Sequence, residues 1–233
     1  MGASVRVMRV VIAGGHGKIA LRLERVLSGR GDRAVGLVRN PDHVPDVQQT
    51  GADAHVVDLE ASTAEQLAET LSGADAVVFA AGAGPGSSAE RKDTVDRGAA
   101  VLLADAAVVA GVPRYVLISS PGVDRPPAPG TDEVWAAYLR AKKAAEVEVA
   151  QRAVALTVLR PGRLTDDAGT GLVKLAPPGL PRGDVTREDV AEVVAGLLAE
   201  PASDGLVLDL LGGDTPVADA IAAVVRGNGG TQP

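Results

Sequence analysis

Short apolar runs alternate along the chain with longer segments in which hydrophobic residues recur at helical spacing. The short runs are rich in Val, Ile, Leu and Ala without polar alternation, which predicts strands buried on both faces, as in parallel sheets. The expected strands are Arg9–Ala13, Ala34–Val38, Ala54–Val57, Ala76–Phe79, Tyr115–Ser119, Leu156–Leu159 and Leu206–Leu210. The expected helices are Gly17–Ser28, Thr63–Leu71, Asp93–Ala110, Asp132–Arg152, Arg187–Ala199 and Thr215–Arg226.

This strand–helix alternation predicts right-handed βαβ units and therefore the α/β class. We expect a Rossmann-like doubly wound parallel sheet with helices on both faces and a small C-terminal extension on the substrate side. A single domain would span residues 9–226, of which about 165–226 contribute the substrate side. Residues 1–8 are expected to form a flexible leader and residues 227–233 a disordered tail.

The composition narrows the chemistry that the fold can carry. Lys and Arg number 23 against 30 for Asp and Glu, and the resulting net charge of −7 argues against nucleic-acid binding. The absence of cysteine excludes disulfides, thiolate metal sites and cysteine nucleophiles. The three histidines have no metal-ligand spacing, so we expect no metal site. No apolar run is long enough to span a membrane and no secretory pattern is evident, so a cytoplasmic location is expected.

The most informative stretch follows the first expected strand, where a glycine-rich turn opens a helix. Its spacing is G-x-x-G-x-x-A, and such a turn brings the backbone and the free helix N–H groups close to a pyrophosphate. The alternative is an ordinary strand–helix turn that contains three glycines. The context favours a dinucleotide site, with the expected contacts Gly14, Gly15, His16, Gly17, Lys18 and Ile19.

The end of the second expected strand bears on which dinucleotide is bound. NAD sites place an acidic residue there to bind the ribose 2′-hydroxyl, whereas this strand ends in Arg39 and Asn40. An arginine suits the 2′-phosphate of NADP, so NADP(H) is favoured over NAD(H). The alternative is that Arg39 is a solvated loop residue. Further contacts are expected after the third and fourth strands, from Asp58 and Leu59 and from Ala80, Ala81 and Gly82.

Tyr138 and Lys142 are four residues apart in an expected helix and therefore share one face. The reference pKa of a tyrosine is about 10, and a nearby ammonium lowers that pKa, so such a phenol can act as general acid or base in carbonyl chemistry. Ser119 and Ser120 stand at the end of the fifth expected strand, and a hydroxyl there would orient the substrate oxygen. The alternative is a tyrosine packed on the core beside a solvated lysine.

Together these segments resemble the short-chain dehydrogenase/reductase superfamily, in particular its atypical NmrA-like and epimerase-type members. The resemblance covers Arg9 to Ala223 and is carried by the glycine turn, by the end of the second strand, by Leu117–Ser120, by Tyr138–Lys142 and by Leu159–Thr165. It implies catalytic roles for Tyr138, Lys142 and Ser120. It also implies cofactor contacts from Ser119, Lys142, Pro161, Gly162 and Arg163.

We therefore expect an NADP-dependent oxidoreductase that moves hydride between the cofactor and a small carbonyl or alcohol. One alternative is an NAD(P)-dependent epimerase or dehydratase that holds its cofactor tightly. Another is a non-catalytic redox sensor that binds NADP(H). A small-molecule substrate is the expected partner, without nucleic acid or membrane, in a monomer or a homodimer.

Overall fold

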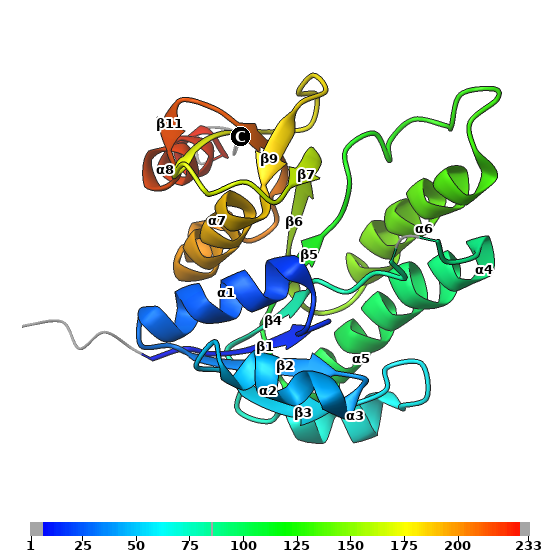
Figure 1. Cartoon of the computed structure of the whole chain (residues 1–233), viewed down its shortest axis with the longest axis vertical. Helices are drawn as coiled ribbons and strands as arrows, with labels where there is room; N and C mark the ends of the chain where they lie inside the picture. The colour runs from blue at the N-terminus through cyan, green and yellow to red at the C-terminus, as the bar shows by residue number, and fades with distance from the viewer. Residues whose placement is uncertain (1–6, 85, 229–233) are drawn as a thin grey trace, which may run out of the picture.

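The computed structural model describes residues 7–84 and 86–228, which build a nine-stranded sheet in the order β11-β8-β10-β6-β5-β4-β1-β2-β3 (Figure 1). Most of the strands are parallel to one another: β1 (Arg9–Ala13), β2 (Arg33–Val38), β3 (Asp53–Val56), β4 (Ala76–Phe79), β5 (Arg114–Ile118), β6 (Ala155–Pro161) and β10 (Val207–Gly212). At one edge, β8 (Leu172–Ala176) runs antiparallel to β10, and β11 (Thr215–Pro216) runs antiparallel to β8. A separate pair joins β7 (Arg163–Thr165) to β9 (Asp184–Thr186).

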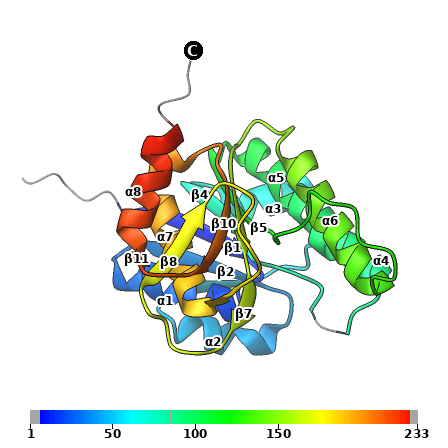
Figure 2. The same ribbon diagram turned by 90° about the horizontal axis from the view of Figure 1, so that it is seen from above.

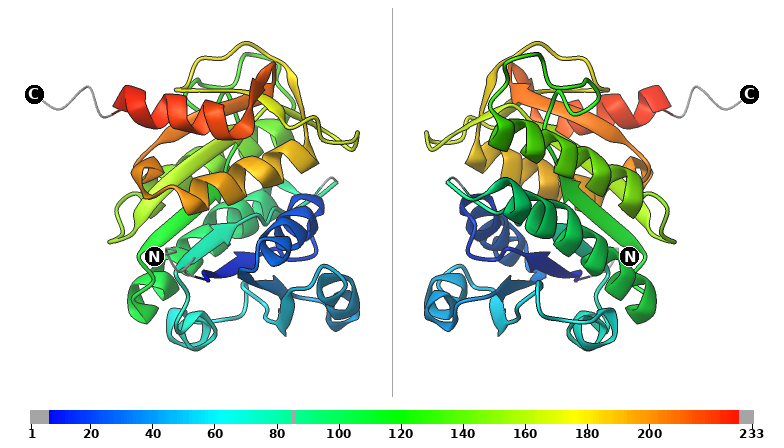
Figure 3. Two further views of the ribbon diagram at one scale, coloured as in Figure 1. Left: turned by 90° about the vertical axis from the view of Figure 1, so that its left-hand side faces the viewer. Right: turned by 90° about the vertical axis from the view of Figure 1, so that its right-hand side faces the viewer.

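Helices cover both faces of the sheet. On one face α1 (Lys18–Gly29), α7 (Arg187–Ala199) and α8 (Val217–Asn228) pack with Val10 and Ile12 of β1. The other face is covered by α3 (Ala64–Leu71), α5 (Ala100–Ala110) and α6 (Glu133–Val149). Figure 2 shows the two helix groups on opposite sides of the strands, and the two views of Figure 3 look at α8 and α7 on one side and at α6 on the other.

The predicted Rossmann-like α/β fold is confirmed, and each expected strand is present within a few residues of its expected ends. Leu172–Ala176 is not among the expected strands, but it forms β8, whose alternating burial shows that only one of its faces is covered. The expected helix Asp93–Ala110 begins as a π-helical segment, η2 (Lys92–Ala99), and continues as α5. The remaining short elements are η1 (Pro41–His43), α2 (Val44–Gln48), α4 (Ala89–Arg91) and η3 (Pro201–Ser203).

Within the described ranges, no helix combines the length and the apolarity that crossing a bilayer requires. The expected leader and tail lie largely outside these ranges, at residues 1–6 and 229–233.

Glu24 is a carboxyl group buried inside the apolar layer between α1 and the sheet. It is fully inaccessible, its Oε1 has no hydrogen-bond partner among the residues that the structure describes, and its Oε2 lies 3.5 Å from the Thr50 hydroxyl. A Cβ on Gly36 of β2 would stand 2.5 Å from Oε1, so only glycine leaves room for this side chain. Burial raises the pKa of Glu24 to about 8, and the group is therefore neutral at pH 7 in the folded chain.

The raised pKa of Glu24 makes stability depend on pH. Between its unfolded value near 4.5 and about 8, the folded state holds a proton that the unfolded state releases, so the free energy of unfolding falls as the pH rises. Glu24→Gln keeps the shape and cannot ionise, so we expect it to flatten this slope and to be more stable than the wild type at pH 8.5. Urea unfolding across pH 5–9 measures this. Glu69→Gln, at an exposed site on α3, is the control, and an unchanged slope in Glu24→Gln would refute the assignment.

Candidate functional site

The turn between β1 and α1 approaches two other strands too closely for side chains. Gly14 has φ +80°, and a Cβ there would lie 2.7 Å from the Cα of Ala81, just after β4. A Cβ on Gly15 would lie 2.7 Å from the Cα of Gly36 in β2, and the Gly15 amide donates to the carbonyl of Leu37 at 2.9 Å. The turn is therefore held at the point where β1, β2 and β4 end together.

Helix α1 begins directly after this turn with no side chain capping it. Gly17 is its N-cap residue and offers no side-chain hydrogen bond. The first-turn N–H groups of a helix need partners and carry the positive end of the helix dipole. A glycine cradle that ends in an uncapped helix fits the pyrophosphate of a dinucleotide.

A cleft of about 640 Å³ opens over the turn at the carboxyl edge of the sheet. Most of the residues expected to bind cofactor line it, namely Gly14, His16, Gly17, Lys18, Ile19, Arg39, Asp58, Leu59, Ala80, Ala81 and Gly82. The residues after β4, from Ala80 to Gly84, contribute small side chains to its lining. Its volume is that of a site for a sizeable organic ligand.

Other expected contacts lie outside the lining of this cleft. Gly15 packs against β2, and Asn40 caps η1 by accepting from the Asp42 amide at 3.0 Å. Pro161 is buried at the end of β6, Gly162 packs on Gly183, and Arg163 is exposed and paired with Asp184 across β7 and β9. From this segment it is the next residue, Leu164, that reaches the cleft.

Two acidic side chains, Glu60 and Asp166, form ion pairs with the basic groups around the cleft. Glu60 Oε2 lies 3.2 Å from Arg39 Nη1 and 3.0 Å from Arg91 Nη2, while Thr94 donates to Oε1 at 2.9 Å. Across the turn, Asp166 accepts from Lys18 Nζ at 2.6 Å and from Arg187 Nη1 at 2.9 Å. The Lys18 hydrogen bond lowers the pKa of Asp166.

His16 is held at the rim of the cleft. Its ring stacks on that of His43 with centroids 3.6 Å apart, and its Nε2 lies 2.8 Å from Asp46 Oδ2. These contacts tie the glycine turn to η1 and α2, so His16 helps to hold the wall beside the end of β2.

Tyr138 and Lys142 share one face of α6, as their spacing predicts. Lys142 is 4% exposed, and its Nζ donates to the Ile118 carbonyl at 3.1 Å and lies 3.2 Å from Asp96 Oδ1 in η2. Asp96 is 1% exposed, and its Oδ2 accepts from the Ala83 amide at 3.3 Å. This chain of contacts joins α6 to the cleft wall after β4, although Tyr138 itself is not among the cleft residues.

The tyrosine ring is half-buried between aromatic and basic groups. The Trp135 ring stacks on it at 5.0 Å, and the Nζ atoms of Lys92 and Lys142 lie 5.4 and 5.8 Å from its centroid. Lys92 Nζ also donates to the carbonyl of Gly84, which lines the cleft.

The serines that end β5 have different surroundings. Ser119 Oγ donates to Glu146 Oε1 at 2.6 Å inside a buried network, which engages the hydroxyl expected to contact cofactor. Ser120 is also buried, but its only hydrogen bond within the described residues is a long one of 3.4 Å to the Pro121 carbonyl. Of the two hydroxyls, that of Ser120 would lose only this weak hydrogen bond on binding a ligand.

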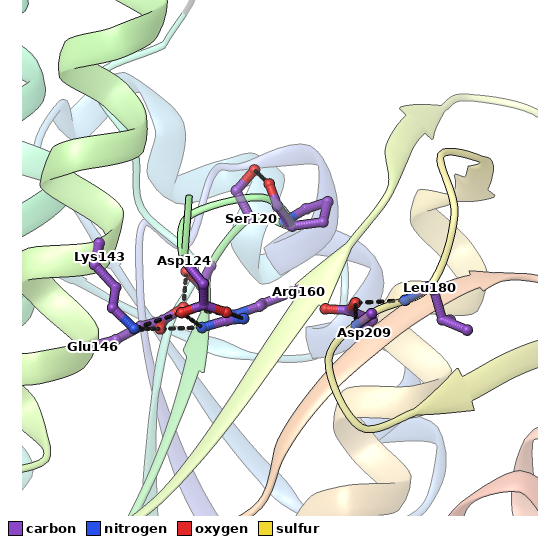
Figure 4. A network of polar contacts seen from close by, with 10 residues as sticks. Ser120, Asp124, Lys143, Glu146, Arg160, Leu180 and Asp209 are labelled. Carbon is purple, nitrogen blue, oxygen red and sulfur yellow. Dashed lines mark hydrogen bonds and ion pairs between the residues drawn. The ribbon is translucent and has the colours of Figure 1, made fainter. Parts of the chain in front are cut away.

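Figure 4 shows the network that fixes this strand end. Arg160 of β6 is 2% exposed and binds Glu146 of α6 on one side and Asp124 of the loop between β5 and α6 on the other. Lys143 Nζ lies 2.6 Å from Asp124 Oδ1. The hydrogen bonds from Arg160 and then Lys143 lower the pKa of Asp124 to about 2, so this carboxylate is ionised at physiological pH.

Comparison with known proteins agrees with this geometry. Residues 14–201 match a family model described as NAD(P)H-binding. The chain is 31% identical over 215 residues to a protein of Bacillus subtilis (strain 168) named "Uncharacterized sugar epimerase YhfK", covering 92% of this chain and 99% of that one.

Solved structures extend the likeness. A putative NAD-dependent epimerase/dehydratase from Bacillus halodurans has a TM-score of 0.86 and 33% identity, covering 93% of this chain and 100% of its own. The oxidoreductase ylbE from Lactococcus lactis has a TM-score of 0.81 and 27% identity, covering 94% and 97%.

Several residues at the cleft could not be predicted from the sequence. Glu60, Arg91 and Arg187 line it, and Asp166 pairs with two of its cations, yet none of these four belongs to a recognisable motif. Arg187 follows the helix cap Thr186, which would have placed it at the start of α7 and hence at the carboxyl edge of the sheet. Nothing in the local sequence marks Arg91.

The close contacts of the turn predict that adding a single methyl group at Gly14 is harmful. Gly14→Ala requires a left-handed backbone at a non-glycine residue and pushes Cβ into Ala81, so we expect a loss of about 1–3 kcal/mol of stability and at least tenfold weaker NADPH binding. Gly29→Ala is the matched control, because its Cβ would meet nothing within 4 Å at the end of the same helix. Fluorescence titration with NADPH measures the affinities, and equal values for the two variants would contradict the assignment of the turn.

Proposed function

The chain belongs to the NAD(P)H-binding family, and we propose that it is an NADP-dependent oxidoreductase acting on a small carbonyl or alcohol. The observation that carries this proposal is the placement of Tyr138. Its ring lies against Lys92, which donates to the Gly84 carbonyl of the cleft wall, and against Lys142, which is linked to Ala83 of that wall through Asp96. A cofactor seated on the glycine turn and extended along that wall would bring its reactive end toward the phenol.

The residues of this chain have separable roles in such a reaction. When bound, the nicotinamide supplies a hydride to the carbonyl carbon or accepts one from the alcohol. In the reducing direction the Tyr138 phenol donates its proton to the carbonyl oxygen and is left as a phenolate, which water reprotonates. Ser120 Oγ donates a hydrogen bond to the same oxygen and orients it. Lys142, fixed by Asp96 and the Ile118 carbonyl, holds the ribose side of the site and the tyrosine helix in place.

Replacing the phenol tests the catalytic role. We expect Tyr138→Phe to lose at least about 100-fold in NADPH-dependent turnover across a panel of small carbonyls, because the proton donor is gone. NADPH affinity should change less than about threefold, since the ring is retained. Tyr115→Phe is the matched control, because that hydroxyl is buried and donates to the Ala100 carbonyl, away from the cleft.

Two outcomes of that experiment would redirect the proposal. Full turnover in Tyr138→Phe would remove the tyrosine from catalysis. Tight NADPH binding by the wild type with no turnover on any carbonyl would favour a sensor over an enzyme.

The convergence of two arginines supports NADP(H) over NAD(H). Arg39 and Arg91 approach the same oxygen of Glu60 at the end of the cleft beside β2. Two guanidinium groups meeting at one anionic oxygen form a suitable receptor for a phosphate monoester such as the 2′-phosphate. Asp58 and Leu59, on the same wall, are proposed to bracket the adenine.

The cofactor preference has its own test. We expect Arg39→Ala and Arg91→Ala each to weaken NADPH binding by about tenfold, which corresponds to losing one charge-assisted hydrogen bond, and to leave NADH binding nearly unchanged. Arg25→Ala, at an exposed site on α1, removes the same charge away from the cleft and serves as control. Calorimetric titration with both cofactors gives the ratio, and equal weakening toward NADPH and NADH would overturn the role of these arginines.

An epimerase or dehydratase is the second candidate, because relatives similar along their whole length are named for sugar epimerase and epimerase/dehydratase activity. Such a reaction would use the same tyrosine, but the hydride would return to the substrate. Cofactor that stays bound through purification, together with product formation without net NADPH consumption, would favour it.

A further inference from the structure

Tyr138 has two ammonium neighbours, of which only Lys142 belongs to the spacing that the sequence singles out. Lys92 Nζ is the nearer to the ring, at 5.4 Å against 5.8 Å. Lys92 is 8% exposed, so its charge is poorly screened by water. Figure 1 shows α4, whose end leads into Lys92, lying alongside α6.

The positive charge of Lys142 is neutralised by an adjacent carboxylate, that of Asp96. Asp96 Oδ1 lies 3.2 Å from its Nζ, and both side chains are buried. Seen from the ring of Tyr138, the pair is a dipole rather than a cation. Its net effect on a charge at the phenol is therefore small.

Lys92 has no such balance. Its Nζ donates to the Gly84 carbonyl at 2.8 Å, and among residues 7–84 and 86–228 no carboxylate forms an ion pair with it. The π-helical winding of η2 sets Lys92 and Asp96 on the same buried side, with Asp96 turned to Lys142. Such wide turns within helices occur often at functional sites.

The other charged groups on elements that pack against α6 are neutralised or exposed. Glu90 of α4 is exposed to solvent. On α4, η2, α5 and α6, the remaining charges form ion pairs, namely Arg91–Glu60, Arg97–Asp93, Arg97–Glu148, Asp105–Arg152, Glu133–Arg140, Lys143–Asp124 and Glu146–Arg160. Lys92 is thus the buried cation beside the ring whose charge is uncompensated.

We propose that Lys92, more than Lys142, supplies the net positive charge that stabilises the phenolate of Tyr138. This rests on the proposed role of Tyr138 as the proton donor and acceptor. Phenolate charge spreads over the ring, so an ammonium above the ring face attracts it. Lys92 acts through Tyr138 and is a positioning residue, while Lys142 keeps the helix and the ribose side of the site in place.

The chain itself offers a substrate-free test. It has only two tyrosines, and burial raises the pKa of Tyr115 well above 10, so the near-ultraviolet absorbance of phenolate reports Tyr138 as the pH is raised. Removing a nearby cation disfavours the phenolate. In Lys92→Met we therefore expect phenolate to form at a pH at least about one unit higher than in the wild type, because a unit charge roughly 5 Å from the ring is removed at a poorly solvated site.

Three further variants complete the experiment. Lys92→Arg restores the charge and should titrate as the wild type does, which a purely structural role for the aliphatic stem would not require. Arg140→Met removes an exposed charge from α6 and should leave the midpoint unchanged. Tyr138→Phe provides the blank, because its titration lacks the phenol in question.

The result that overturns the proposal is a midpoint in Lys92→Met that matches the wild type. If Lys92→Met does not fold, Lys92→Gln replaces it, with the same expectation. The outcome is independent of catalysis, because a shifted midpoint combined with full turnover in Tyr138→Phe would refute the proposed function and leave the electrostatic role of Lys92 standing.

Discussion

A buried ion pair between Lys142 and Asp96 joins the two parts of the site. Both side chains are almost inaccessible, and together they tie α6, the end of β5 and the loop after β4 to one point. Removing one partner of such a pair costs about 3–5 kcal/mol, because the other charge is left buried and unpaired. The position of Tyr138 relative to the cleft therefore depends on this contact.

The cleft itself depends on backbone segments that meet without side chains between them. Gly14 against Ala81 and Gly15 against Gly36 bring the ends of β4 and β2 to the turn after β1. The basic groups around the cleft are already held by Glu60 and Asp166. An entering phosphate would compete with carboxylates for these donors, so binding exchanges one set of charge-assisted hydrogen bonds for another and the net gain is smaller than a count of contacts implies.

The sequence predicts what local patterns determine. Apolar runs such as Val10–Ala13 predict the parallel strands, and the glycine turn predicts the edge of the sheet at which the cleft opens, because burial on both faces and glycine geometry are local requirements. Contacts between segments that are distant in the chain have no local sequence pattern, so they could not be predicted. Arg91, Arg187 and Lys92 are ordinary basic residues in the sequence, and only the tertiary packing of α4, η2 and α7 gives them their neighbours. The burial of Ser119 against Glu146 is likewise a product of packing between β5 and α6.

A crystal structure of the chain with NADP⁺ bound tests the central claim most directly. The account predicts the pyrophosphate on the glycine turn, the 2′-phosphate between Arg39 and Arg91 with Glu60 displaced, and the nicotinamide directed toward Tyr138 and Ser120. A cofactor bound elsewhere, or one whose nicotinamide points away from Tyr138 and whose 2′-phosphate contacts neither arginine, would contradict it.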